Sequence, residues 1–143
     1  MILIIDSNIL ISALIRDSTT RKILIESSWQ FCYPEQSFHE VRKYKNLVLE
    51  KSGMTEQEYT EVLNRLLKHI TLIPEEIMQH KLKEADDLLG KIDPDDVIFL
   101  ATALSLDNSN IWSDDGHFEK QSKVRTFKTE HIVKLFYLAN KEE

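Results

Sequence analysis

The chain has 143 residues, of which 42% are apolar, enough for one globular domain with its own hydrophobic core. Its formal net charge of −6 argues against general electrostatic affinity for nucleic acid, although a cation-binding acid cluster would itself supply several of these charges. The single cysteine excludes an intramolecular disulfide. With no apolar run of about 18 residues and no secretory leader, we expect a cytoplasmic protein without a membrane span.

The first predicted element is a strand over 2–5. Its four apolar residues do not alternate with polar ones, which is typical of a strand buried on both faces of a parallel sheet. Asp6 follows at the carboxyl end of this strand, where ligands bind in open α/β sheets. Asp6 or Ser7 could equally be a cap of the helix predicted over 8–15, because both residue types are favoured caps.

Strands and helices alternate along the rest of the chain. Further strands are predicted over 29–33, 70–73, 110–112 and 123–127, and helices over 19–27, 34–52, 55–67, 75–89, 97–104 and from 129 onwards. The helix over 97–104 is apolar almost all round and should be the central buried one. This alternation implies right-handed crossovers. The predicted fold is α/β, a three-layer α/β/α sandwich with a mostly parallel central sheet, in a single domain over 1–143.

Two neighbouring helices, over 34–52 and 55–67, form a predicted arm. Each has an apolar stripe at three- and four-residue spacing, and Thr55 with Glu58 has the pattern of a capping box. Such an arm could cover the core, form a homodimer or offer a groove to a partner protein. The sequence leaves these three interpretations open.

Acidic residues recur where this topology brings strand ends and helix starts together. Asp6 ends the first strand, Asp115 follows the fourth, and Asp96 begins the central helix, so all three are predicted at one edge of the sheet. Glu40 lies within the second turn of its helix and can reach the same edge if its side chain points inward. A glutamate on a surface helix is nevertheless more often only solvated.

Each of these acids also has an ordinary structural explanation. Asp93 precedes a proline and is expected to be a helix cap, and Asp95 and Asp96 would each gain about 0.3 to 1 kcal/mol from the helix dipole. Asp114 and Asp115 could be turn residues. Their convergence favours a site, because unrelated caps and turns have no reason to gather on one edge.

Several carboxylates at one edge create an electrostatic problem. Two of them about 4 Å apart repel by roughly 4 kcal/mol at an effective dielectric constant of about 20. Either some are protonated or a cation is bound, and an all-oxygen set suits Mg²⁺ or Mn²⁺. Such an ion can activate water and stabilise the leaving oxygen in phosphodiester hydrolysis. We therefore expect metal-assisted phosphoryl transfer to water.

The chain carries four motifs in this order: Ile4-Ile5-Asp6-Ser7-Asn8, Glu40, Asp96 with Ala101-Thr102-Ala103, and Trp112-Ser113-Asp114-Asp115-Gly116-His117-Phe118. Together they resemble the PIN-domain family, and the likeness covers nearly the whole chain. The family includes the VapC-like toxins of toxin–antitoxin pairs, and its activity is Mg²⁺- or Mn²⁺-dependent cleavage of single-stranded RNA. The resemblance implies four metal-binding, catalytic acids: Asp6, Glu40, Asp96 and Asp115.

The same resemblance suggests supporting residues and leaves some choices to the family pattern. The supporting residues it implies are Asn8, Ser113, Asp93 and Asp114. The choice of Asp96 over Asp95, and of Asp115 over Asp114, rests on that pattern and not on spacing. Glu35 could compete with Glu40, although its place after a proline better suits a helix-dipole residue.

Positive charge near the acids would be needed to bind RNA. Possible RNA contacts are Arg42, Lys43 and Lys45, with Arg16, Arg21 and Lys22 beyond the first helix. A solvated helix face explains these residues equally well. His39 is expected to point away from Glu40, and the turn residue His117 is expected at the surface. The expected partners are the RNA substrate, a possible antitoxin protein and a second copy in a homodimer.

The main rival function is a non-catalytic or weakly catalytic PIN-like module that binds RNA or a partner protein. A complete acid set argues against it, because binding alone would have no use for the electrostatic cost. A receiver-like phosphoacceptor needs an aspartate at the end of the middle strand, where this chain has Ile73. A haloacid-dehalogenase-type phosphatase needs a second aspartate where this chain has Asn8.

Overall fold

A parallel sheet with the strand order β3-β2-β1-β4-β5 forms the centre of the computed structural model, which describes residues 1–91 and 94–141. The strands are β1 (Ile2–Ile5), β2 (Gln30–Pro34), β3 (Ile70–Ile73), β4 (Ser109–Trp112) and β5 (Thr126–Phe127). The middle strand β1 is buried from Leu3 to Ile5, as its unbroken apolar run predicts. The predicted α/β fold with a parallel central sheet is confirmed.

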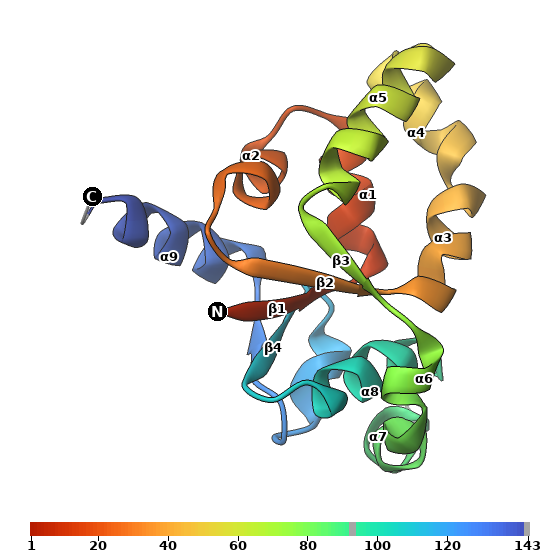
Figure 1. Ribbon diagram of the computed structural model, residues 1–143, viewed down its shortest axis with the longest axis vertical. Helices are drawn as coiled ribbons and strands as arrows, with labels where there is room; N and C mark the ends of the chain where they lie inside the picture. Colours follow the sequence, from red (N-terminus) through yellow and green to blue (C-terminus); the bar gives the residue numbers. More distant parts are fainter. Residues whose placement is uncertain (92–93, 142–143) are drawn as a thin grey trace.

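Helices cover both faces of this sheet (Figure 1). One layer contains α1 (Ser7–Ile15), α2 (Thr19–Glu26), α3 (Phe38–Lys43), α4 (Lys45–Ser52) and α5 (Glu56–Leu67), and the other contains α6 (Glu75–Met78), α7 (Leu82–Leu89) and α8 (Val97–Ser105). The last helix, α9 (Thr129–Lys141), packs against α2. This is the three-layer arrangement that the alternation of strands and helices predicts.

The central helix α8 packs on β1, β2 and β4 and contacts α6 and α7. Its buried residues are Val97, Phe99, Leu100, Ala101, Thr102 and Ala103. One polar residue, Thr102, donates its hydroxyl to the Ile98 carbonyl oxygen at 2.8 Å, so its burial leaves no unsatisfied hydroxyl. The prediction of a central buried helix is therefore confirmed.

The prediction of one continuous helix over 34–52 is wrong. Pro34 ends β2 beside Ile73 instead of opening a helix, a 3₁₀ turn (Glu35–Ser37) follows, and α3 and α4 are separate. Tyr44 at their junction is non-helical, with φ −95° and ψ 7°. Both helices bury an apolar side chain, Val41 and Val48, so packing on the core fixes a change of direction that periodicity does not reveal. Glu40 consequently lies in the first turn of α3, not in a second turn.

The helix predicted over 75–89 is likewise divided, into α6, a 3₁₀ turn (Gln79–Lys81) and α7. Both α6 and α7 contact α8, so the break lets each short helix bury its own apolar side chain, Met78 and Leu89. The strand predicted over 123–127 is shorter in the structure, where only β5 is extended. The side-chain amide of Gln121 donates to the Val124 carbonyl oxygen and accepts the Val124 N–H, which holds this segment in a turn before the strand begins.

The predicted arm corresponds to α3, α4 and α5. The Thr55–Glu58 capping box is present, and Gly53 ends α4 in the left-handed conformation with φ 72°. Val48 and Leu66 are fully buried, and α4 and α5 both contact α1, so the arm covers the core. Among the described residues, no helix is both long enough and apolar enough to cross a membrane.

Candidate active site

A small cavity of about 60 Å³ lies at the carboxyl edge of the sheet, where α1, α3 and α8 begin. We call this cavity the acid pocket. It is lined by Asp6, Ser7, Asn8, Glu40, Asp95, Asp96, Phe99 and Asp115. All four acids of the predicted catalytic set thus line one cavity, although they come from distant parts of the sequence. The parallel topology explains this, because strand ends and helix starts share the edge.

Asp6 is both a helix cap and a member of the acid pocket. Its Oδ1 accepts a hydrogen bond from the Ile9 N–H at 3.0 Å, and its Oδ2 accepts one from the Ser113 hydroxyl. The side chain is only 5% exposed. Burial raises the pKa of Asp6 from 3.8 to about 6, the two hydrogen bonds lower it in part, and the negative charge of Asp115 raises it further.

Ser113 connects the first and fourth acids. It follows Trp112, which pairs with Ile5 in the sheet, so Ser113 and Asp6 leave neighbouring strands side by side. Its buried hydroxyl donates to Asp6 and accepts the Asp115 N–H at 3.0 Å. This serine therefore holds the carboxylate of Asp6 and the backbone of Asp115 together at the edge of the sheet. Asn8, the other neutral residue implied by the resemblance, is exposed at the lining of the pocket.

Glu40 and Glu35 have separate locations. Glu40 is half-buried and lines the acid pocket, whereas Glu35 is exposed and lines a neighbouring cleft of about 400 Å³. His39 also lines that cleft, with Nδ1 2.8 Å from the Gln36 carbonyl oxygen, so it points away from the acids as expected. The geometry therefore places Glu40 with the other acids and Glu35 apart from them.

A buried tyrosine, which the sequence reasoning missed, links the starts of α1 and α3. The Tyr33 hydroxyl lies 2.7 Å from the Ser7 hydroxyl and donates to the Ser37 carbonyl at 2.9 Å. Its ring packs against Phe99 of the acid pocket, with 5.8 Å between ring centroids. Burial raises the pKa of Tyr33 above its ordinary value, so it remains a neutral hydrogen-bonding group. The only sequence signal was a tyrosine at the end of a predicted strand.

The sequence has two pairs of adjacent aspartates, at 95–96 and at 114–115, and the structure places the two pairs differently. Asp95 and Asp96 both line the acid pocket, Asp95 exposed and Asp96 only 8% exposed. Asp114, by contrast, accepts hydrogen bonds from the N–H and hydroxyl of Thr129, both at 2.7 Å. Asp114 thus caps α9, and Thr129 is the first residue of that helix and not its cap. Asp93 lies outside the described residues.

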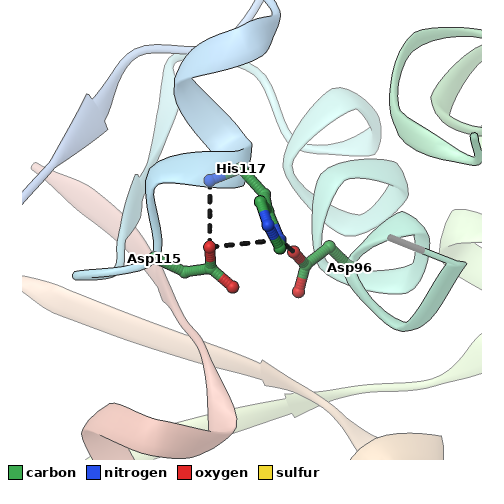
Figure 2. Close-up of side chains that lie close together, drawn as sticks. All are labelled: Asp96, Asp115 and His117. Carbon is green, nitrogen blue, oxygen red and sulfur yellow. Dashed lines mark hydrogen bonds and ion pairs between the residues drawn. The ribbon is translucent and has the colours of Figure 1, made fainter. Parts of the chain in front are cut away.

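His117 is partly exposed, as expected for a turn residue at the surface, but it also lies against the acids, which the sequence did not predict. Figure 2 shows its ring between Asp96 and Asp115. Its Nδ1 is 3.2 Å from Asp115 Oδ1 and 3.5 Å from Asp96 Oδ2, although 45% of its side chain is exposed. Its backbone N–H also donates to Asp115 Oδ1 at 2.9 Å. The expected all-oxygen group of ligands therefore has a nitrogen atom beside it.

The cationic side chains predicted to contact RNA near Glu40 each lie over an aromatic ring. The Arg42 guanidinium lies 5.2 Å from the centre of the Phe38 ring, and Lys43 and its neighbour Tyr44 form a similar pair at 5.6 Å. Both cations are exposed. Lys45 lies 5.6 Å from the centre of the Tyr59 ring and also forms an ion pair with Glu56 at 3.8 Å, so part of its charge is already neutralised within the protein.

The cations beyond the first helix lie far from the acids. Arg21 donates to the Ala13 and Leu14 carbonyl oxygens at 2.7 and 3.3 Å, at the carboxyl end of α1. Asp6 is at the opposite end of this helix, about 13 Å away for nine residues. Arg21 is therefore explained as a helix cap, and a phosphate bound there would be remote from the acid pocket.

A family model described as a PIN domain matches residues 4–134. The chain belongs to the PIN-domain family. The match covers nearly the whole chain and confirms the resemblance seen in the sequence motifs. PIN domains are generally metal-dependent nucleases. No curated protein matches this PIN domain in sequence.

The acid pocket of this PIN domain fits a divalent cation. Carboxylate oxygens are the ligands that hard cations prefer, and one cavity is lined by five carboxylates, from the residue after β1, from α3, from the two residues before α8 and from the segment after β4. The raised pKa of Asp6 shows that surrounding protein groups do not fully compensate the burial of negative charge. A bound cation would supply the missing compensation.

Proposed function

We propose that this PIN domain is a Mg²⁺- or Mn²⁺-dependent endoribonuclease that hydrolyses phosphodiester bonds of single-stranded RNA. The observation that supports the proposal most directly is the gathering of Asp6, Glu40, Asp96 and Asp115 around one cavity. Each acid alone could be a cap or a turn residue. Four of them at one edge raise the electrostatic energy of the fold, and a site with no chemical role would have no use for that cost.

The proposed mechanism uses all four acids. Asp6, Asp96 and Asp115 would hold the cation, and Glu40 would either join them or orient the attacking water. The cation would supply activation of water and stabilisation of the leaving oxygen. Ser113 fixes the carboxylate of Asp6 and the backbone of Asp115, so these acids need little reorganisation. No side chain is needed as a covalent nucleophile.

The substrate would be bound through its phosphates. Because the chain has a net charge of −6, binding depends on local contacts and not on the overall field. Arg42 and Lys43 are exposed on α3, the helix that carries Glu40, so they are the best-placed phosphate contacts. Loss of either should weaken RNA binding and reduce the salt dependence of the binding constant by about one phosphate contact.

The test is cleavage of end-labelled single-stranded RNA by the purified protein in Mg²⁺ or Mn²⁺. EDTA should abolish cleavage. Asp96→Asn should reduce it by more than about 100-fold, because even residues that only orient metal ligands are worth 10- to 100-fold. Asp107→Asn is the matched control, since Asp107 is exposed just beyond the opposite end of α8. A parallel labelled DNA strand shows whether the site requires ribose.

Failure of this test would support the rival function. If RNA is bound but not cut, or if cleavage survives Asp96→Asn, the domain is a binding module or the activity belongs to a contaminant. A gel-shift titration with the same RNA separates these outcomes. The binding module would show a saturable shift that Asp96→Asn leaves unchanged.

We also propose that the nuclease acts as the toxin of a toxin–antitoxin pair and that it forms a homodimer. The arm of α3, α4 and α5 leaves the large side chains Tyr44 and Leu47 exposed, and these could contact an antitoxin or a second copy. Induced expression of the wild type should arrest growth, and Asp96→Asn should not. Light scattering of the purified protein gives the mass, and Leu47→Glu should convert a dimer formed through this arm to a monomer.

A further inference from the structure

We infer that His117 is a further metal-binding residue at the acid pocket, beside the acids, and that its ring nitrogen gives the site a preference for first-row transition ions such as Mn²⁺ over Mg²⁺. The inference rests on the proposed function, because it requires Asp96 and Asp115 to bind a divalent cation. It adds a nitrogen ligand to a set that the sequence indicates is made only of oxygen atoms.

The spacing of the three side chains fits ligands of a single ion. Ligand atoms of Asp96, Asp115 and His117 all lie within 4.8 Å of one another. The His117 Nδ1 is 3.2 Å from Asp115 Oδ1 and 3.5 Å from Asp96 Oδ2 (Figure 2). In an octahedral site with bonds of about 2.1 Å, adjacent ligands are about 3.0 Å apart and opposite ligands about 4.2 Å. The two distances from His117 are slightly wider than those of adjacent ligands, so a small inward movement of the carboxylates and the ring would allow all three to bind one ion.

The backbone positions His117 for this role. Asp115 is the N-cap of the 3₁₀ turn Gly116–Lys120 and accepts the His117 N–H, while Ser113 accepts the Asp115 N–H. The next residue, Phe118, is fully buried and anchors the turn in the core. Asp96 approaches from the start of α8 on the other side of the ring. The 3₁₀ turn with its cap and the start of α8 therefore hold the donor atoms together before any ion binds.

The choice of metal follows from the chemistry of the donor atoms. Mg²⁺ prefers oxygen ligands and keeps several of its waters, so an imidazole nitrogen adds little to its binding. First-row transition ions accept imidazole, and Mn²⁺, which binds it least strongly of this series, still binds it more strongly than Mg²⁺ does. One nitrogen beside several carboxylates should therefore strengthen Mn²⁺ binding more than Mg²⁺ binding.

The same two distances would also arise if the imidazole only forms ion pairs with the two carboxylates. Pulsed electron paramagnetic resonance of the Mn²⁺-loaded protein separates the two arrangements, because a nitrogen bonded to Mn²⁺ gives a coupling that an ion-pair neighbour does not. The variants are His117→Ala and, as a matched control, His39→Ala. His39 is an exposed histidine whose ring bonds the Gln36 carbonyl outside the acid pocket.

We expect the nitrogen coupling in the wild type and in His39→Ala, and its loss in His117→Ala. The Mn²⁺ dissociation constant of His117→Ala should rise by about 10-fold or more. The Mg²⁺ constant should change by less than about threefold. Bound Mn²⁺ without nitrogen coupling in the wild type, or coupling that persists in His117→Ala, would overturn the inference and leave the proposed nuclease intact. No binding of Mn²⁺ to the wild type would overturn both.

Discussion

The two ends of α1 each carry a charged side chain that caps the helix, but their surroundings differ. At the amino end, Asp6 accepts the Ile9 N–H, and at the carboxyl end Arg21 donates to the Ala13 and Leu14 carbonyls. Both charges suit the helix dipole. Burial favours the neutral form of both side chains, because it lowers the pKa of Arg21 and raises the pKa of Asp6.

The neighbours of these two caps decide what each end can do. Arg21 has neighbours of both signs, Asp17 stabilising its charge and Arg65 disfavouring it, whereas the charged neighbours that shift the pKa of Asp6, Asp115 and Asp114, both disfavour its charge. A cap requires one carboxylate, and the additional carboxylates at the amino end work against the fold. Surplus negative charge therefore distinguishes the amino end of α1 from the carboxyl end, and it is the feature on which the proposed function rests.

The largest expected effect comes from Asp6→Asn. The asparagine keeps an oxygen for the Ile9 N–H but removes a buried charge, so RNA cleavage should fall by more than about 100-fold while the metal-free protein becomes more stable. The gain in the free energy of unfolding should be at most about 3 kcal/mol, the equivalent of the raised pKa of Asp6. Urea unfolding in EDTA measures it. A loss of stability would show that Asp6 is mainly a structural cap.

The stability of the metal-free protein should depend on pH in the window set by Asp6. Its pKa is about 6 in the folded protein and 3.8 as its ordinary value, so between these values the folded state binds more protons than the unfolded state. Stability should therefore fall as the pH rises from about 4 to 6, by at most roughly 3 kcal/mol from this group. Unfolding curves at several pH values measure the slope. The slope should be smaller in Asp6→Asn, and an identical slope in both proteins would contradict the assignment.

Removal of the serine that supports the acids should have an intermediate effect. Ser113→Ala deletes the hydroxyl shared by Asp6 and Asp115 and should weaken metal binding by about 10- to 100-fold. Ser109→Ala is the matched control. Ser109 lies at the opposite end of β4, and its hydroxyl donates to the Ala103 carbonyl oxygen of α8. Calorimetric titration with Mn²⁺ compares them. Equal loss of affinity in both variants would mean that the effect is a general one on the strand.

Loss of the cap at the other end of α1 should have the smallest effect on function. Arg21→Ala removes two hydrogen bonds to helix carbonyls and should cost about 1 to 2 kcal/mol of stability. RNA cleavage per folded molecule should change by less than about twofold, since Arg21 is remote from the acid pocket. Lys22→Ala, at the exposed neighbouring cation, is the control. A large loss of cleavage in Arg21→Ala would place RNA at this end as well.

The sequence predicts the elements whose surroundings are uniform. The unbroken apolar run of β1 and the nearly all-apolar α8 show their burial directly, and the alternation of strands and helices implies the parallel sheet. The breaks around Tyr44 and after Met78 are not visible in the sequence, because apolar periodicity continues through both. Packing of the short helices on α1 and α8 produces these breaks.

The site is predictable to a similar degree. Asp6, Asp96 and Asp115 could be placed at one edge from topology alone, because strand ends and helix starts meet there. Asp114 and Asp115 cannot be distinguished by spacing, and only the bonds of Asp114 to Thr129 show that it serves α9. His117 had no periodic pattern to indicate its direction, which is set by the turn that Asp115 caps.

We propose that the surplus negative charge of the acid pocket serves to bind a divalent cation. The most direct measurement is the free energy of unfolding with and without Mg²⁺, for the wild type and for Asp6→Asn. At 100 times the dissociation constant, Mg²⁺ should stabilise the wild type by about 2.7 kcal/mol. It should stabilise Asp6→Asn far less, because one carboxylate ligand is gone. Equal stabilisation of both proteins, or none of either, would contradict the claim.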